Sequence, residues 1–199
     1  MHYDPRKSGP GIPSFAITAL VLPRPIGWIS TLGADGVVNL APYSFFNAIA
    51  GRPAFVMFAS SGRKDSQRNA EEQGEFVANL ATFDLREAVN LTSAGVAPEI
   101  DEAALAGLEM APSVNVRPPR VRRSPVALEC VTTNSIKLTT RDGVESRNTV
   151  VIGEVVGIYV DEAVLTDGRV DVRKLRPLSR LGYDEYAVTD AVFSMTRPD

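Results

Sequence analysis

Residues 38–47 combine polar side chains with a feature that would place them against a bound molecule. Asn39, Tyr43 and Ser44 surround Pro42 in an otherwise apolar stretch. Because proline lacks an N–H group, a sheet tolerates it only at an edge or a bulge. A bulged strand of this kind exposes backbone donors and acceptors, which would suit a flat heterocycle with a donor/acceptor edge. An ordinary edge strand with a polar face is the alternative interpretation.

A second stretch, residues 59–69, has the chemistry of a phosphate cradle. An apolar segment is followed by small hydroxyl residues, two cations and a helix start: Ser60, Ser61, Gly62, Arg63, Lys64, Asp65 and Ser66. Backbone N–H groups at a helix N-terminus bind anions, and Arg and Lys add charge-assisted hydrogen bonds. The spacing is not that of a P-loop. A capped surface helix with solvated charges would give a similar pattern.

Two further segments carry residues of interest. Residues 23–31 hold the only tryptophan, Trp28, followed by the hydroxyls of Ser30 and Thr31. Residues 176–183 hold Arg176 and Arg180, which a turn that docks the tail would leave in solvent.

The elements that must position these residues are mostly β-strands. Short apolar stretches rich in β-forming residues recur, each followed by turn residues: 26–31, 37–46, 54–59, 75–81, 126–138 and 149–160. Glycines in 33–36 and 141–143 supply the positive φ that hairpin turns need. This spacing predicts a mainly β protein with a few helices, built as an antiparallel barrel rather than from βαβ units.

Four short helices are expected. The first spans 65–73 with Asp65 or Ser66 as its cap, and the second opens on a capping box at Asp84 and runs toward Ala94. The others cover 101–108 and 171–176. The prolines in 114–125 predict an extended surface connection there.

Composition limits the class of protein. The 199 residues are 44% apolar, which supports one domain over 1–199, with 1–14 as an N-terminal extension. The net charge of −3 gives no attraction to nucleic acid or to an anionic membrane. A single cysteine forms no intramolecular disulfide, no apolar run approaches a membrane span, and no apolar region follows the basic start. We therefore expect a cytoplasmic location.

Several segments, in one order along residues 17–186, resemble the flavin reductase-like family of FMN-binding split-barrel proteins. The family includes flavoredoxins and reductase components of two-component monooxygenases. The matching segments are 24–31, 39–47, 64–69, 74–80, 124–130, 151–155 and 180–183. The resemblance implies a split β-barrel that binds FMN non-covalently.

The resemblance also implies which residues contact the cofactor. The isoalloxazine and ribityl chain would lie against Trp28, Ile29, Ser30, Thr31, Asn39, Ala41, Pro42, Tyr43 and Ser44. The phosphate would be held by Ser60, Ser61, Arg63, Lys64 and Ser66. Ser66 stands where the family often has threonine, a difference that keeps the hydroxyl.

The activity implied is an NAD(P)H-dependent flavin oxidoreductase that supplies electrons or reduced flavin to a partner monooxygenase or other acceptor. Either NADH or NADPH would be the transient donor, and such proteins are usually homodimers with the flavin near the subunit interface. Many short-chain flavin reductases carry a histidine near their C-terminus, whereas the only histidine here is His2. The alternatives are a flavoredoxin-like electron carrier that retains its FMN and a non-enzymatic flavin-binding module.

In this family the flavin does the chemistry, so we assign no catalytic residue. We also expect no metal site. Cys130 is expected in the core, and the carboxylates in 99–102 on an exposed helix face. The arginines of 117–123 are expected on a solvated loop; contact with an NADPH 2′-phosphate or with the acidic face of a partner is the alternative.

Overall fold

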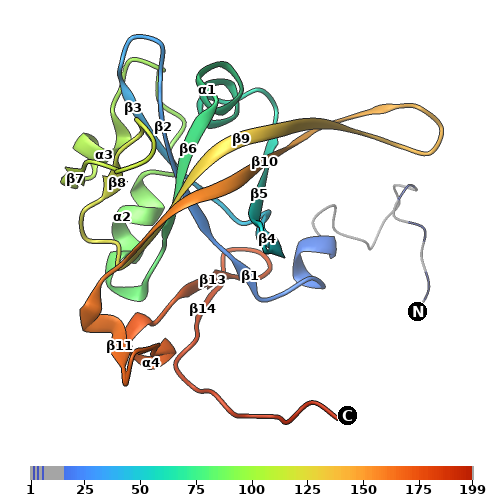
Figure 1. Cartoon of the computed structure of the whole chain (residues 1–199). Coiled ribbons are helices and arrows are strands. Elements are labelled where there is room, and N and C mark those ends of the chain that lie inside the picture. Colours follow the sequence, from blue (N-terminus) through green and yellow to red (C-terminus); the bar gives the residue numbers. More distant parts are fainter. Residues whose placement is uncertain (1, 3, 5, 7–15, 199) are drawn as a thin grey trace.

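The fold is mainly β, as expected, with 43% of the residues in strands and 17% in helices (Figure 1). The computed structural model describes residues 2, 4, 6 and 16–198. The expected N-terminal extension, 1–14, lies outside the described residues apart from 2, 4 and 6.

A seven-stranded antiparallel sheet forms the body, with the strand order β3-β2-β6-β9-β10-β5-β4. Its strands are β2 (Gly27–Leu32), β3 (Val38–Tyr43), β4 (Phe46–Gly51), β5 (Ala54–Ser61), β6 (Glu75–Leu80), β9 (Val126–Thr139) and β10 (Glu145–Val160). The two edge strands, β3 and β4, are separated in the chain by only two residues. The sheet therefore curves round until its edges approach each other.

The seam between these edges corrects one expectation. A single strand over 37–46 was predicted, but the chain leaves β3 after Tyr43 and begins β4 at Phe46. Between them, the carbonyl oxygen of Phe45 accepts a hydrogen bond from the N–H of Ala59 at 2.8 Å. The expected edge position of Pro42 is confirmed, because β3 is an edge strand with Pro42 opposite Trp28. The register of β3 on β2 is regular, so the predicted bulge is absent there.

Both predicted hairpin turns are present. Gly36 (φ 84°) closes the β2–β3 turn, and its N–H donates to the carbonyl oxygen of Gly33 at 3.0 Å. Gly143 (φ 82°) closes the β9–β10 turn, and its N–H donates to the carbonyl oxygen of Thr140 at 2.9 Å. The β9–β10 hairpin extends as a long arm beyond the rest of the body (Figure 1).

Short strands and helices complete the described part of the chain. The strands are β1 (Arg24–Pro25), β7 (Met110–Ala111), β8 (Arg120–Val121), β11 (Leu165–Thr166), β12 (Arg169–Val170), β13 (Leu178–Arg180) and β14 (Tyr186–Val188). The helices are η1 (Ala16–Ala19), α1 (Asp65–Gln73), η2 (Phe83–Leu85), α2 (Arg86–Leu91), α3 (Glu102–Leu105), η3 (Glu162–Val164) and α4 (Val172–Leu175). Strands β1, β13 and β14 form a separate three-stranded sheet.

Two capping predictions are wrong. The bounds of α1 agree with the prediction, but its N-cap is Lys64, which makes no side-chain cap hydrogen bond. Asp84 does not open a helix with a capping box, because it lies inside η2 and accepts a hydrogen bond from Arg176 instead. Helix α2 begins only at Arg86 and ends before the predicted 94.

The core has two main clusters of buried side chains. One surrounds Trp28 and Leu40, and the other surrounds Phe58 and Phe76, whose rings meet edge to face at 5.3 Å. Cys130 lies in the second cluster, as expected, and burial raises the pKa of its thiol. The backbone of β10 approaches Phe76 so closely that a Cβ at Gly153 would lie 2.5 Å from the ring.

The 114–125 segment is not the simple surface connection that was predicted. Val116, Val121 and Ser124 are buried, and the N–H of Val121 donates to Oδ1 of Asn79 at 2.8 Å. Three of its four arginines have partners: Arg117 pairs with Glu75, Arg122 pairs with Glu109, and Arg120 lies over the ring of Tyr159.

None of the described helices is long and apolar enough to cross a membrane.

Candidate functional site

A cavity of about 460 Å³ opens at the seam of the barrel. This seam cavity lies between strand β3, the start of α1 and the loop that follows α2. Its lining residues are Asn39, Ala41, Pro42, Tyr43, Ser44, Phe45, Ala59, Ser61, Lys64, Asp65, Ser66, Thr92, Ser93, Ala94, Gly95, Val96 and Glu102. Small-molecule sites typically measure roughly 300–1,000 Å³, so the seam cavity is large enough for a cofactor.

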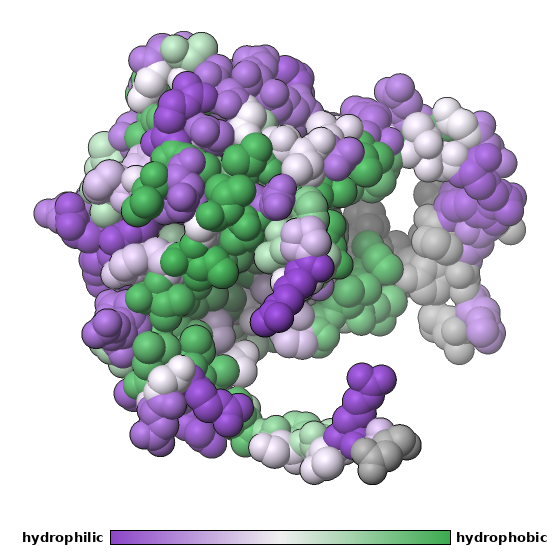
Figure 2. Space-filling model, viewed as in Figure 1, coloured by the Kyte–Doolittle hydropathy of each residue, from purple (hydrophilic) through white to green (hydrophobic). Residues whose placement is uncertain are grey.

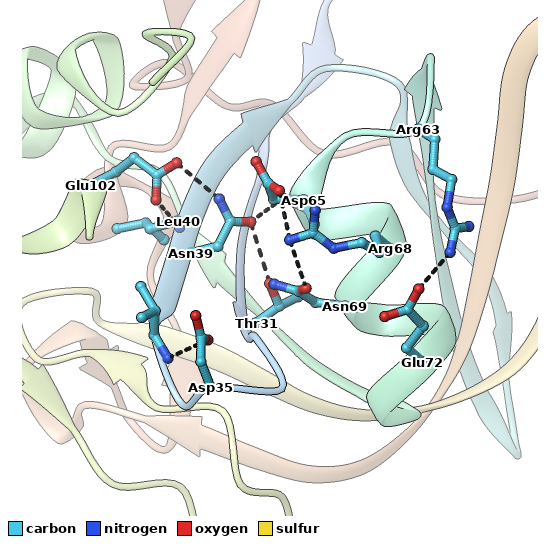
Figure 3. A network of polar contacts seen from close by, with 12 residues as sticks. Thr31, Asp35, Asn39, Leu40, Arg63, Asp65, Arg68, Asn69, Glu72 and Glu102 are labelled. Atoms are coloured by element: carbon cyan, nitrogen blue, oxygen red, sulfur yellow. Dashed lines mark hydrogen bonds and ion pairs between the residues drawn. The ribbon is translucent and has the colours of Figure 1, made fainter. Parts of the chain in front are cut away.

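A hydrogen-bonded network around Asn39 holds the floor of the cavity (Figure 3). The Asn39 Oδ1 accepts from Ser66 Oγ at 2.7 Å and from Thr31 Oγ1 at 3.3 Å. Its Nδ2 donates to Glu102 Oε1 at 2.9 Å, and the Leu40 N–H donates to the other carboxylate oxygen at 3.0 Å. The network therefore ties β3 to α1 on one side and to α3 on the other.

Glu102 is a site residue that the sequence analysis missed. It was expected on an exposed helix face, but only 6% of it is exposed and it lines the cavity. Burial raises the pKa of its carboxyl group, and the hydrogen bonds from Leu40 and Asn39 act in the opposite direction. No local pattern marks Glu102 as buried, because its partners lie more than 60 residues away in the chain.

The Tyr43 hydroxyl is a buried polar group without a hydrogen-bond partner. The phenol ring packs on Phe58 with ring centroids 4.9 Å apart. Its oxygen lies near Ser60 and Ser66, whose hydroxyls donate elsewhere, to Gly62 and Asn39. Burial raises the pKa of the phenol. Because buried polar groups are nearly always paired, this hydroxyl is suited to bind a ligand in the cavity.

The start of α1 forms the other end of the cavity. No side chain caps this helix, so the backbone N–H groups of its first turn have no partners within the helix. The Lys64 side chain is exposed beside them and lines the cavity. The neighbouring carboxylate, Asp65, is paired with Arg68 along the helix at 2.7 Å (Figure 3). A helix end with an adjacent lysine favours an anion.

The structure brings eight of the predicted site residues to the cavity wall. They are Asn39, Ala41, Pro42, Tyr43, Ser44, Ser61, Lys64 and Ser66. The six others do not line it: Trp28, Ile29, Ser30, Thr31, Ser60 and Arg63.

Most of these six are buried behind the wall. Trp28 is in the core, and its Nε1 donates to Oγ1 of Thr92, a cavity residue, at 2.8 Å. Ser30 donates to the carbonyl oxygen of Pro119 at 2.6 Å. Ile29 and Ser60 are also buried.

Arg63 differs from the other five because it is exposed and turned away from the cavity. It pairs with Glu71 and, at 2.7 Å, with Glu72 on the outer side of α1 (Figure 3).

The 92–96 loop is a second part of the site that the sequence analysis missed. Residues 92–94 were expected within a helix, but α2 ends at Leu91 and leaves residues 92–96 to line the cavity.

Within the described residues, no group of three or more His, Cys, Asp or Glu side chains is arranged to hold a metal ion.

The curved antiparallel sheet agrees with the split-barrel fold of solved flavin reductase-like structures. The chain belongs to the flavin reductase-like domain family, whose model matches residues 19–179.

Solved structures and relatives agree with this assignment. Nitrilotriacetate monooxygenase component B from Bacillus cereus is 31% identical, with a TM-score of 0.90 and 98% of each chain covered. The 2-nitrobenzoate 2-nitroreductase of Pseudomonas fluorescens is 30% identical, with a TM-score of 0.82 and coverage of 93% of this chain and 90% of that one. A relative from Halalkalibacterium halodurans, described only as uncharacterized, is 39% identical over 89% of this chain and 87% of its own.

Proposed function

We propose that the seam cavity binds FMN non-covalently and that the protein is an NAD(P)H-dependent flavin oxidoreductase. The observation that carries the proposal is that the two ends of the cavity differ in chemistry. One end has an uncapped helix N-terminus beside Lys64, and the other has the polar edge strand β3. A molecule with a phosphate at one end and a planar donor/acceptor ring at the other fits this arrangement.

Each part of the wall has a role in this proposal. Lys64, Ser61 and the first turn of α1 would hold the phosphate, while Asn39 and residues 41–44 would face the ring and ribityl chain. Tyr43 offers an unpaired buried hydroxyl to the ligand. Of the residues expected to contact the cofactor, Trp28, Ile29, Ser30, Thr31 and Ser60 would support this wall from behind.

When bound, FMN supplies the two-electron chemistry, and the protein controls its position and surroundings. Glu102 and Asn39 hold the floor of the cavity in one arrangement, because every hydrogen-bonding atom of the Asn39 amide group has a partner. Phe45 and the 92–96 loop form part of the cavity wall and would cover one side of the bound flavin.

The likeness to nitrilotriacetate monooxygenase component B supports a role in supplying reduced flavin to a partner monooxygenase. Anaerobic titration of the FMN-loaded protein with NADH and with NADPH tests this role. We expect rapid bleaching of the flavin absorbance by one or both donors, with reduced FMN released on gel filtration. Bleaching by dithionite but by neither nicotinamide would contradict the nicotinamide dependence.

The same experiment examines a second candidate, reduction of a small organic acceptor by retained flavin. The likeness to a 2-nitrobenzoate 2-nitroreductase supports it. Reduced FMN that stays with the protein and is reoxidised by an added nitroaromatic would favour this role. Retained flavin with slow nicotinamide turnover would instead favour an electron carrier.

We also propose a homodimer, because apolar surface and an open sheet edge remain uncovered. Edge strand β4 is mostly exposed, and the Ile49 side chain on it is 50% exposed. Figure 2 shows apolar residues gathered over the middle of the face that β9 and β10 cross. Val131, Val156 and Ile158 of these strands are exposed. Unpaired edges and large apolar patches typically mark interfaces.

Light scattering should therefore report about twice the chain mass of 21.4 kDa. Replacing Ile49 with Glu should shift the protein to monomers at micromolar concentration, because a charge would be buried at the edge of β4. Val114→Glu is the matched control, since Val114 is already 89% exposed, and it should remain dimeric. A monomeric wild-type protein would contradict the dimer and leave the flavin assignment standing.

A further inference from the structure

A second cavity of about 430 Å³ adjoins the seam cavity. It is lined by Thr18, Arg24, Ser44, Arg180, Leu181, Tyr183 and Asp184. Ser44 lines both cavities, so a molecule in this arginine cavity would lie next to one in the seam cavity. The proposed function assigns no role to this second cavity.

The two arginines of this cavity lie side by side. Arg24 of β1 is paired directly opposite Arg180 of β13. Like charges in this relation are destabilising unless something compensates for them. The arrangement therefore favours an anion in the cavity.

Arg24 carries a buried charge that no carboxylate in the described part of the chain compensates. Only 7% of it is exposed, and its guanidinium donates to the carbonyl oxygens of Thr18, Val21 and Leu181. Its Nε is buried without a partner, and no carboxylate among the described residues pairs with Arg24. Burial, together with the charge of Arg180, lowers the pKa of Arg24. Buried charges are ordinarily paired, so the buried guanidinium with its unpartnered Nε is suited to bind an anion.

Arg180 is available at the rim of the same cavity. Its side chain lies over the ring of Tyr186 and donates to the carbonyl oxygen of Tyr183. Arg180 Nη2 lies 3.6 Å from Oδ1 of Asp184, which is fully exposed. This ion pair therefore compensates little of the charge of Arg180. Tyr183 adopts a left-handed backbone (φ 56°), and a Cβ at Gly182 would lie 2.6 Å from Ala19. The loop that carries these residues therefore packs closely against η1 beside the cavity.

We propose that the arginine cavity binds an oxyanion, a carboxylate or a phosphate, on the molecule that exchanges a hydride with the flavin. Guanidinium groups match both oxyanions with paired hydrogen bonds. The oxyanion would neutralise the two arginines, while the reacting part of the same molecule would reach past Ser44 into the seam cavity. The assignment to the flavin's reaction partner rests on the proposed function, whereas anion binding itself does not.

Calorimetry on the protein without flavin tests anion binding directly, with inorganic pyrophosphate and benzoate as probes. We expect at least one to bind, and Arg180→Gln to weaken it by about tenfold, the loss of one charge-assisted contact. The control is Arg117→Gln, which removes an exposed arginine paired with Glu75 and should leave binding unchanged. Arg24 is not altered because it also joins three backbone carbonyls. No binding of either probe, or equal loss in the control, would overturn the proposal.

Kinetics on the FMN-loaded protein then identify the source of the oxyanion. NADH is compared with uncharged 1-benzyl-1,4-dihydronicotinamide, and 4-nitrobenzoate with nitrobenzene. Arg180→Gln should raise KM by roughly tenfold for the charged member of one pair only. Equal effects on the charged and uncharged members of both pairs would overturn the link to the flavin. Failure to bind FMN would refute the proposed function instead, and calorimetry would still report on the anion site.

Discussion

Replacing Lys64 with alanine should weaken FMN binding by about tenfold and leave riboflavin binding unchanged, because riboflavin lacks the phosphate. A charge-assisted hydrogen bond is worth about 1.5–3 kcal/mol, and the exposure of Lys64 favours the lower end of that range. Lys64→Glu should weaken FMN roughly a hundredfold, since it also adds repulsion at the helix N-terminus. Fluorescence titration of both flavins measures the difference.

Arg63 provides the matched control for this prediction. It is the adjacent cation, but its guanidinium pairs with Glu71 and Glu72 on the outer side of α1. Arg63→Ala should therefore change FMN affinity little. If Arg63→Ala and Lys64→Ala weakened FMN equally, or if riboflavin lost as much affinity as FMN, the position assigned to the phosphate would be wrong.

Replacing Asn39 with Asp should destabilise the protein by about 2–4 kcal/mol at pH 8, because two carboxylates would then share a buried site. The Asn39 Nδ2 that now donates to Glu102 at 2.9 Å would become an oxygen. The same change would disturb the cavity floor and weaken FMN binding. Urea denaturation at several pH values measures the loss of stability.

The pH dependence of this loss has a definite sign. Burial already raises the pKa of Glu102 in the folded protein, so the folded state binds a proton more readily than the unfolded state. Stability from this group therefore falls as pH rises from the ordinary glutamate pKa through the raised one. A second carboxylate raises the pKa further, so the destabilisation by Asn39→Asp should be smaller at pH 5 than at pH 8.

The double variant Asn39→Asp/Glu102→Gln is the control. It restores one donor and one carboxylate to the pair, so it should recover much of the stability and flatten the pH dependence. An equal loss at both pH values in the single variant would show that the two side chains do not interact as the structure indicates.

Features set by local sequence were predicted well. The bounds of α1 follow from its polar helical pattern and the left-handed Gly74 that ends it, and both hairpins follow from their glycines. The break between β3 and β4 was missed because it depends on a change of pairing partner: residues up to Tyr43 pair with β2, whereas Phe45 already hydrogen-bonds to Ala59 of β5. Residues 37–46 alone carry no signal for it.

The site was predicted in part for the same reason. The resemblance to flavin reductase-like proteins identified β3 and the start of α1, which are contiguous segments. It did not indicate that Arg63 and Lys64, adjacent in the chain, would point to opposite sides of the helix end. That choice depends on Glu71 and Glu72 two turns later. Burial of Glu102 depends on Asn39, which lies in a different element.

Titration of the purified, flavin-free protein with FMN, followed by its visible spectrum and by calorimetry, tests the central claim most directly. The proposed site, with the phosphate at Lys64 and the ring against residues 39–44, predicts saturation near one FMN per chain. The dissociation constant should be micromolar or tighter, a binding free energy of about −8 kcal/mol or better. A shifted flavin spectrum with that stoichiometry is the expected result. Absence of both heat and spectral change at millimolar FMN would contradict the assignment of the seam cavity as a flavin site.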